Sequence, residues 1–374
     1  MNEMSNNQKR LSNIELLRII SMLLVVTLHF LGRGGVNDST ILFSAEYFMA
    51  NVWDAVAIVS VDLFVLISGY FLINSKFKPQ KLIDIVVQVL TYSVSLYIIC
   101  ILLGIVEFSL SSFVKAFFPI LTNQYWFATA YVALYIIFPF LNAGIHALTQ
   151  KQHRNLCIIL GMSLTLYLPS KALGENGTSV VWFICLYVFA AYLRLHYTPQ
   201  NKVPIKAIVI YLISTAALPL SRYAISILAM MTTEQLLTYS KWFYKYNSIF
   251  VTVAAISLFI IFLNINIKGN RLNRLIGIVS PLTFGVYLIH NNPSIREFMW
   301  NAIDLPGMMN KLNIGVFVLC GIGIICGIFC ICAGIEFIRL YIYKKIICTK
   351  FYKKIYNKIS EIQNLHLIDK IFPG

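Results

Sequence analysis

Ten mainly apolar stretches, separated by short polar segments, run along the chain. About 20 such residues in a helix span the hydrocarbon core of a bilayer. The ninth stretch contains Pro281 and Gly285, which a membrane helix tolerates when neighbouring groups satisfy the freed carbonyl. We therefore predict an all-α, polytopic membrane bundle of about ten transmembrane helices, at residues 13–31, 53–73, 82–105, 126–146, 156–170, 180–197, 204–220, 247–266, 275–292 and 313–338.

Composition and charge support this class and give an orientation. A chain of 374 residues with 59% hydrophobic residues and a mean hydropathy of +0.76 is unlike a soluble domain. Of its Lys and Arg residues, 22 fall in the segments predicted to share a side with both termini, and eight fall on the other side. The excess of basic loops predicts that the N-terminus and C-terminus are cytoplasmic. The net charge of +15 then fits membrane lipid headgroups, so we expect no nucleic acid partner.

We expect two regions along the chain. Residues 1–343 form the membrane domain, and residues 344–374 form a basic amphipathic cytoplasmic tail. Within the first region, the segment 294–303 reads as a short helix on the outer surface, with Trp300 at headgroup level.

The first apolar stretch, NIELLRIISMLLVVTLHF over residues 13–30, carries the ionisable residues Glu15, Arg18 and His29. A charged side chain at the bilayer centre costs about 2.5–3.5 kcal/mol on insertion scales, so such residues persist mainly where they are paired or functional. Arg18 and His29 are eleven positions apart, close to three turns, which places both on one helix face with Cα atoms roughly 16 Å apart. Glu15 stands three residues before Arg18 and within reach of it. One face of this helix is therefore polar from near the membrane surface to its interior.

Each of these residues has a chemical and a structural interpretation. A neutral His29 facing a cavity is a competent general base, whereas the alternatives are a hydrogen bond to a neighbouring helix or a haem ligand. Arg18 has the planar fork that binds phosphate, or it pairs with Glu15 or reaches the headgroups. Three lysines of the next inner loop either extend a phosphate site or only follow the inside-positive bias: Lys76, Lys78 and Lys81.

Polar and aromatic residues on other spans are candidates to line a cavity: Asp62, Ser68, Trp126, Tyr131 and His290. Asp62 lies deep in the second span and needs a partner. The pair Ser68-Gly69 is also typical of close helix packing, and Trp126 also suits an outer aromatic belt. Glu336 and Arg339, three residues apart, look like a plain ion pair. None of the eight cysteines falls in a CxxC motif, so we predict no metal site.

The sequence resembles the acyltransferase-3 family of integral-membrane acyltransferases. The resemblance rests on NIELLRIISMLLVVTLHF with its Arg18-to-His29 spacing, and on VDLFVLISGYFL, YWFATAYVALYIIFPFLN and SPLTFGVYLIHNNP. These stretches are spread from the first span to the ninth, so the resemblance covers about 300 residues. It implies about ten transmembrane helices in the bacterial cytoplasmic membrane and transfer of acetyl from cytoplasmic acetyl-CoA to a sugar hydroxyl. The acceptor would be a surface polysaccharide or its lipid-linked precursor.

The resemblance also implies that His29 is catalytic and that Arg18 belongs to the same constellation, to which we add Glu15. His29 would either deprotonate the sugar hydroxyl or carry the acyl group itself. The donor's phosphates are expected at Arg18, Lys76, Lys78 and Lys81. Some relatives carry an additional esterase-like domain, which we do not expect here. The alternative function is a glycan exporter, because a polar face inside a helix bundle also suits a translocation path.

Overall fold

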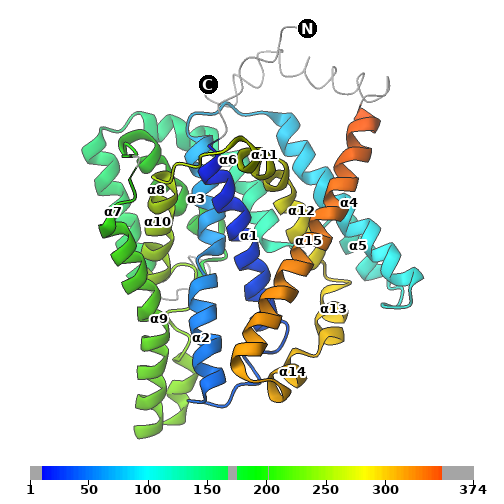
Figure 1. Ribbon diagram of the computed structural model, residues 1–374. Coiled ribbons are helices and arrows are strands. Elements are labelled where there is room, and N and C mark those ends of the chain that lie inside the picture. Colours follow the sequence, from blue (N-terminus) through cyan, green and yellow to red (C-terminus); the bar gives the residue numbers. More distant parts are fainter. Residues whose placement is uncertain (1–10, 167–174, 201, 348–374) are drawn as a thin grey trace.

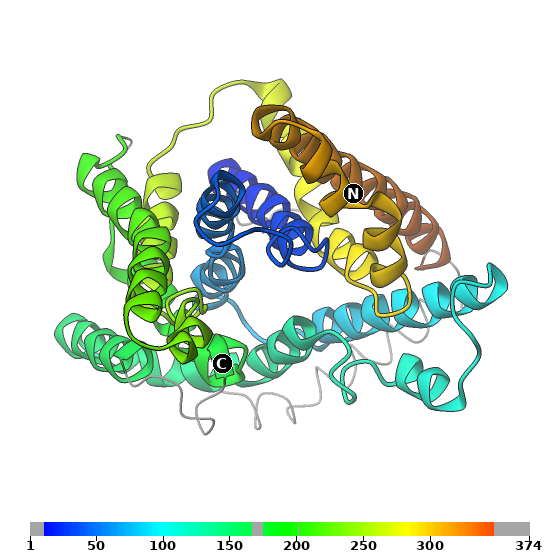
Figure 2. The same cartoon turned by 90° about the horizontal axis from the view of Figure 1, so that it is seen from below.

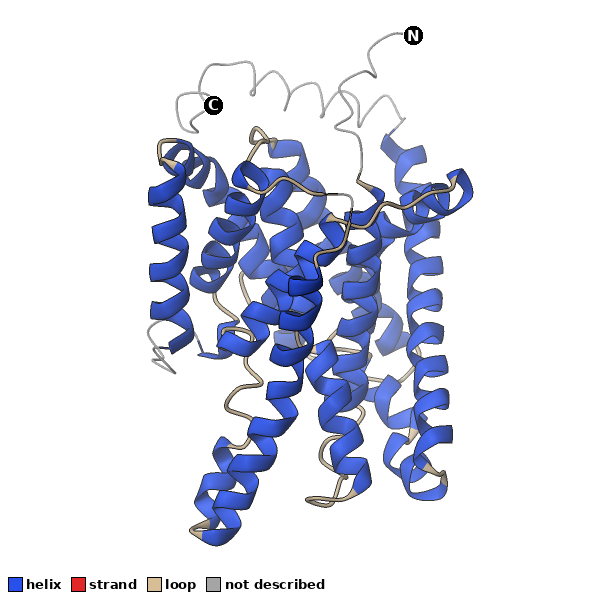
Figure 3. Ribbon diagram, turned by 60° about the vertical axis from the view of Figure 1, so that its left-hand side comes forward, coloured by secondary structure: helices blue, strands red, loops and turns tan. Residues whose placement is uncertain are grey.

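The computed structural model describes residues 11–166, 175–200 and 202–347, and all regular secondary structure in these ranges is helical (Figure 3). The helices are α1 (Ser12–Gly32), α2 (Ala45–Ala57), α3 (Ser60–Leu72), α4 (Pro79–Leu102), α5 (Leu110–Phe117), α6 (Trp126–His146), α7 (Gln150–Leu166), η2 (Glu175–Gly177), α8 (Val180–His196), α9 (Ile205–Met231), η3 (Glu234–Tyr239), α10 (Ile249–Leu263), α11 (Asn270–Val279), η4 (Ser280–Leu282), α12 (Thr283–His290), α13 (Arg296–Ile303), α14 (Leu305–Lys311) and α15 (Ile314–Ile347).

Among the described residues, seven helical stretches are long and apolar enough to cross a membrane. Helices α8 and α10 are apolar but shorter. The protein is thus a polytopic helical membrane protein, while a total of ten spans remains a prediction. The start of α1 and the end of α15 lie on the same side of the bundle (Figure 1).

Two predicted spans are broken helices. The second consists of α2 and α3, which are separated at Ile58 and Val59, and it begins earlier than predicted because the Ser44 side chain caps α2 by accepting from the Tyr47 amide. The ninth consists of α11, η4 and α12, with Pro281 at the tight turn in its centre. Broken helices at membrane depth are tolerated where they are buried in protein or line a cavity.

Helix α9 extends beyond the predicted end at residue 220, so the assignment of Arg222 to an outer segment is wrong. Pro219 lies inside this helix and does not end it. Arg222 is buried, its guanidinium lies 4.7 Å from the Tyr47 ring centroid, and it donates to the Asn51 side chain. Tyr47 and Asn51 of α2 therefore stabilise a charged residue that hydropathy alone would exclude from a membrane helix.

Helix α1 stands at the centre of the bundle, where it packs against α2, α3, α10, α11, α12 and α15 (Figure 2). Its first half, with Ile14 and Leu17, belongs to a core shared with α3, α6, α8 and α10. Its second half, with Val26 and Phe30, belongs to a core shared with α12 and α15. Helix α1 therefore contributes to both hydrophobic cores of the described part of the chain.

The predicted close packing at Ser68-Gly69 is confirmed. A Cβ atom on Gly69 would lie 2.9 Å from the Ala190 Cβ and 3.1 Å from the Tyr187 Cα, so α3 and α8 approach each other at the backbone.

The Trp300 side chain points into the protein, and its level in the membrane stays a prediction. The side chain is only 1% exposed and packs edge-on against Phe30 of α1, with ring centroids 6.4 Å apart. Helix α13 thus packs against the end of α1. Helix α15 passes through the predicted boundary at residue 343, and the tail from residue 348 onward lies outside the described residues.

Candidate active site

Arg18 and His29 line one cavity of about 210 Å³. Its walls come from α1, α3, α4, α6 and α12, together with Tyr246 from the segment that precedes α10. The two residues lie on one helix face, as the eleven-residue spacing predicts, and the cavity follows that face. The other lining residues are Met22, Val25, Leu28, Val61, Phe64, Ser68, Ile85, Trp126, Phe127, Tyr131, Thr283, Phe284 and Tyr287.

His29 forms a pair with His290 of α12. The distance between His29 Nδ1 and His290 Nε2 is 2.9 Å, and the ring centroids are 5.0 Å apart. The opposite nitrogen of His290, Nδ1, lies 2.6 Å from the Val286 carbonyl oxygen. His290 is fully buried and does not line the cavity, whereas His29 is partly exposed and does.

Two arginines lie near His29 at the end of α1. Arg33 Nη1 is 3.4 Å and Arg296 Nε is 3.3 Å from the same carboxylate oxygen of Glu297. Burial and the nearby Arg296 charge lower the pKa of Arg33 from its ordinary value. Both guanidinium charges act on the His29 ring. Two cations therefore share one carboxylate beside the end of α1, and neither arginine lines the cavity.

The Arg18 end is looser. Arg18 Nε lies 3.8 Å from Glu15 Oε2, too far for a hydrogen bond, and the Arg18 side chain is 30% exposed. Its charge and that of Lys78 both act on Lys81 at the start of α4. Lys76 and Lys78 are exposed, and Lys76, Lys78, Lys81 and Glu15 do not line the cavity. The structure thus places Lys81 within electrostatic range of both Arg18 and Lys78, outside the cavity itself.

The remaining sequence candidates divide into two groups. Ser68, Trp126 and Tyr131 line the cavity. Ser68 Oγ already donates to the Phe64 carbonyl at 2.8 Å, and Trp126 packs against Tyr246 rather than serving only as a belt residue. Asp62 lies behind the wall: it is fully buried, and its Oδ1 accepts from Trp182 Nε1 at 3.1 Å. The prediction that Asp62 lines the cavity is therefore wrong, because its partner is a helix-packing tryptophan.

Sequence reasoning missed several lining residues. Thr283, Phe284 and Tyr287 come from α12, and Tyr287 stands three residues before His290, which places both on one side of that helix. This spacing was a usable signal. Tyr246 had no comparable signal, because it reaches the cavity from a non-helical segment whose amide is held by the Asn176 carbonyl at 3.1 Å.

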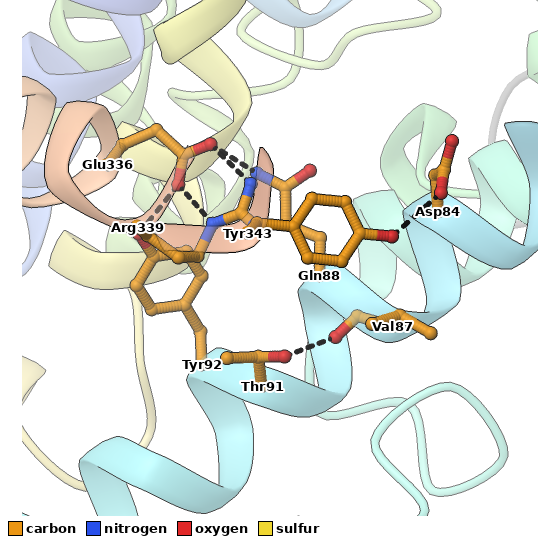
Figure 4. Close-up of polar contacts among 8 residues, drawn as sticks. All are labelled: Asp84, Val87, Gln88, Thr91, Tyr92, Glu336, Arg339 and Tyr343. Carbon is orange, nitrogen blue, oxygen red and sulfur yellow. Dashed lines mark hydrogen bonds and ion pairs between the residues drawn. The ribbon is translucent and has the colours of Figure 1, made fainter. Parts of the chain in front are cut away.

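A buried carboxylate joins α4 to α15 next to α12 (Figure 4). Glu336 is fully buried and accepts two 2.7 Å bonds from Arg339, one of 2.6 Å from the Tyr92 hydroxyl and one of 3.1 Å from Gln88. A Cβ atom on Gly285 would lie 2.5 Å from the Glu336 side chain, so α12 and α15 touch here. The pair Glu336–Arg339 is thus the centre of a network that joins α4 to α15 and packs against α12, and it is more than the plain ion pair predicted.

Within the described ranges, no group of three or more His, Cys, Asp or Glu side chains is arranged to hold a metal ion.

One comparison with known proteins is informative. The family model described as an acyltransferase domain matches residues 11–333. No curated protein and no solved structure matches the chain. The matched range includes α1 with Arg18 and His29, every other residue that lines the cavity, and His290. A match over most of the chain confirms the family resemblance, and the protein belongs to this family of membrane acyltransferases.

Proposed function

We propose that the protein is an integral-membrane O-acyltransferase that moves acetyl from cytoplasmic acetyl-CoA to a sugar hydroxyl of a cell-surface polysaccharide or its lipid-linked precursor. The observation that carries the proposal is the single cavity that contains both Arg18 and His29. A cation near one end and a proton acceptor further in match the layout of coenzyme A, whose phosphates and thioester are joined by a long flexible arm.

The donor's phosphates bind at the Arg18 end. Arg18, Lys78 and Lys81 provide positive charge there, and guanidinium binds phosphate with two parallel hydrogen bonds. The cavity of about 210 Å³ is below the range of about 300–1,000 Å³ typical of whole-ligand pockets. We therefore place only the acyl end of the donor and the reacting hydroxyl inside it, with the nucleotide outside.

The chemistry takes place at His29. The imidazole removes the proton from the sugar hydroxyl, the oxygen attacks the thioester carbonyl carbon, and the carbon–sulfur bond breaks. The departing thiolate takes the proton back from the imidazolium, which leaves the ester, free coenzyme A and neutral His29. Acyl transfer through His29 itself is the second route open to this side chain.

The orientation follows from the donor. With ten spans, both termini and the Arg18 end face the cytoplasm of a bacterial cell, where acetyl-CoA is made. The basic asymmetry of the loops and the position of the start of α1 and the end of α15 on one side support this arrangement. The acceptor then approaches from the His29 end.

The test is NMR of the cell-surface polysaccharide from strains that express the wild-type protein or His29→Ala. We expect O-acetyl signals to disappear in His29→Ala at unchanged protein level in the membrane. His146→Ala is the matched control, because His146 is an exposed helix residue that contacts the Ile73 carbonyl and does not line the cavity. Unchanged O-acetylation in His29→Ala, with altered export of the glycan, would favour the exporter instead.

A further inference from the structure

We propose that His290 is a positioning residue that fixes the tautomer of His29, so that Nε2 of His29 is the atom that accepts the proton. This inference rests on the proposed function, and it adds a defined atom and a second residue to the reaction. It follows from two hydrogen bonds in series, from the Val286 carbonyl through His290 to His29.

The first bond fixes His290. A carbonyl oxygen can only accept, so the nitrogen 2.6 Å from the Val286 oxygen, Nδ1 of His290, must carry a proton. Val286 is four residues before His290 on the same helix, so the position of this acceptor is set by α12 itself.

The second bond fixes His29. His290 Nε2 and His29 Nδ1 are 2.9 Å apart and share a single proton. If the proton were on His290, both of its nitrogens would be protonated and a charged ring would be fully buried, which is costly without a paired anion. In the neutral pair, therefore, His29 Nδ1 donates to His290 Nε2.

The tautomer decides which atom faces the substrate. With Nδ1 protonated, the neutral His29 ring keeps its lone pair on Nε2. Of the two rings, only His29 lines the cavity and is partly exposed, so Nε2 is the acceptor available to a hydroxyl. The opposite tautomer would place a proton at Nε2, where it could donate but not accept.

The same arrangement holds through the reaction. Nε2 takes the hydroxyl proton as the new carbon–oxygen bond forms, and the resulting imidazolium still donates from Nδ1 to His290 Nε2. Nε2 then returns its proton to the thiolate as the carbon–sulfur bond breaks. A neutral imidazole anchored on a backbone carbonyl thus does the orienting that a carboxylate does in a Ser-His-Asp triad.

Two variants separate positioning from packing. In His290→Gln, the amide oxygen can accept from His29 Nδ1 and the amide nitrogen can donate to the Val286 carbonyl. In His290→Leu, a side chain of moderate size fills the space without either bond. We expect His290→Leu to lower kcat about 10- to 100-fold with little change in KM, a part of the about 10²–10⁴-fold that a general base contributes. His290→Gln should recover most of this loss.

The decisive measurement is nitrogen NMR of the purified, histidine-labelled protein without substrate, with the His29 signals assigned by their absence in His29→Ala. In the wild type and in His290→Gln, we expect Nδ1 of His29 to be protonated and Nε2 unprotonated. In His290→Leu, the form protonated at Nε2 should appear.

Protonated Nε2 in the neutral wild-type ring would overturn the inference, as would equal turnover of His290→Leu and the wild type. If His290→Leu does not fold, the tautomer in the wild type and in His290→Gln still decides. Full activity of His29→Ala would instead refute the proposed function, and the tautomer measurement does not depend on it.

Discussion

The two ends of the polar face of α1 differ in how firmly their side chains are held. His29 is bonded at 2.9 Å to a fully buried partner that is itself bonded to backbone. Arg18 is 30% exposed, and its nearest carboxylate atom is 3.8 Å away. Proton transfer requires an atom in a fixed place, whereas a phosphate on a flexible arm can be met by a side chain that moves to it. Along this helix, the side chain proposed to transfer the proton is therefore held firmly, and the side chain proposed to bind phosphate is held loosely.

The largest effect is expected for His29→Ala, which should slow acyl transfer without weakening donor binding. Purified His29→Ala should transfer acyl groups at least about 100-fold more slowly, because the base is lost. Its affinity for acyl-CoA, measured by calorimetry, should stay within a few-fold of the wild type, since the phosphates bind elsewhere. A large loss of affinity would mean that His29 holds the donor and that the two ends are not distinct.

The loose end should show the opposite pattern. Arg18→Ala removes a charge-assisted contact worth about 1.5–3 kcal/mol, which is roughly 10- to 150-fold in acyl-CoA affinity. Arg18→Lys should recover only part of this, because the planar fork is lost. A phosphate-free pantetheine thioester is the comparison ligand, and its binding should not change. If Arg18→Ala binds acyl-CoA as tightly as the wild type, Arg18 is only a partner of Glu15.

The smallest effect is expected at Ser68, which lines the cavity between the two ends. Its hydroxyl already donates to the Phe64 carbonyl, so it has no second proton to give to a developing oxyanion. Ser68→Ala should therefore change kcat less than threefold, in contrast to the about 10²–10³-fold loss expected on removing a true oxyanion donor. A loss of that larger size would show that the hydroxyl turns toward the substrate during the reaction.

The sequence predicts contacts along a helix far better than contacts between helices. The shared face of Arg18 and His29 follows from helix geometry alone, and the structure places both on one cavity. The partner of His29 is 261 residues away, and only the packing of α12 against α1 brings it there. Asp62 shows the reverse error, because burial inside a span gives the same signal for a packing residue as for a lining one.

The position of Glu336 shows that structural contacts beside α12 extend beyond the residues that match the family. The family match ends at residue 333, yet the carboxylate that gathers Arg339, Tyr92 and Gln88 follows three residues later. A shortened chain that kept the whole matched region would leave Tyr92 and Gln88 without their common acceptor, on the side of α12 opposite the active centre. We therefore expect a chain shortened to the matched residues to hold α12 less firmly, although those residues include every side chain that lines the cavity.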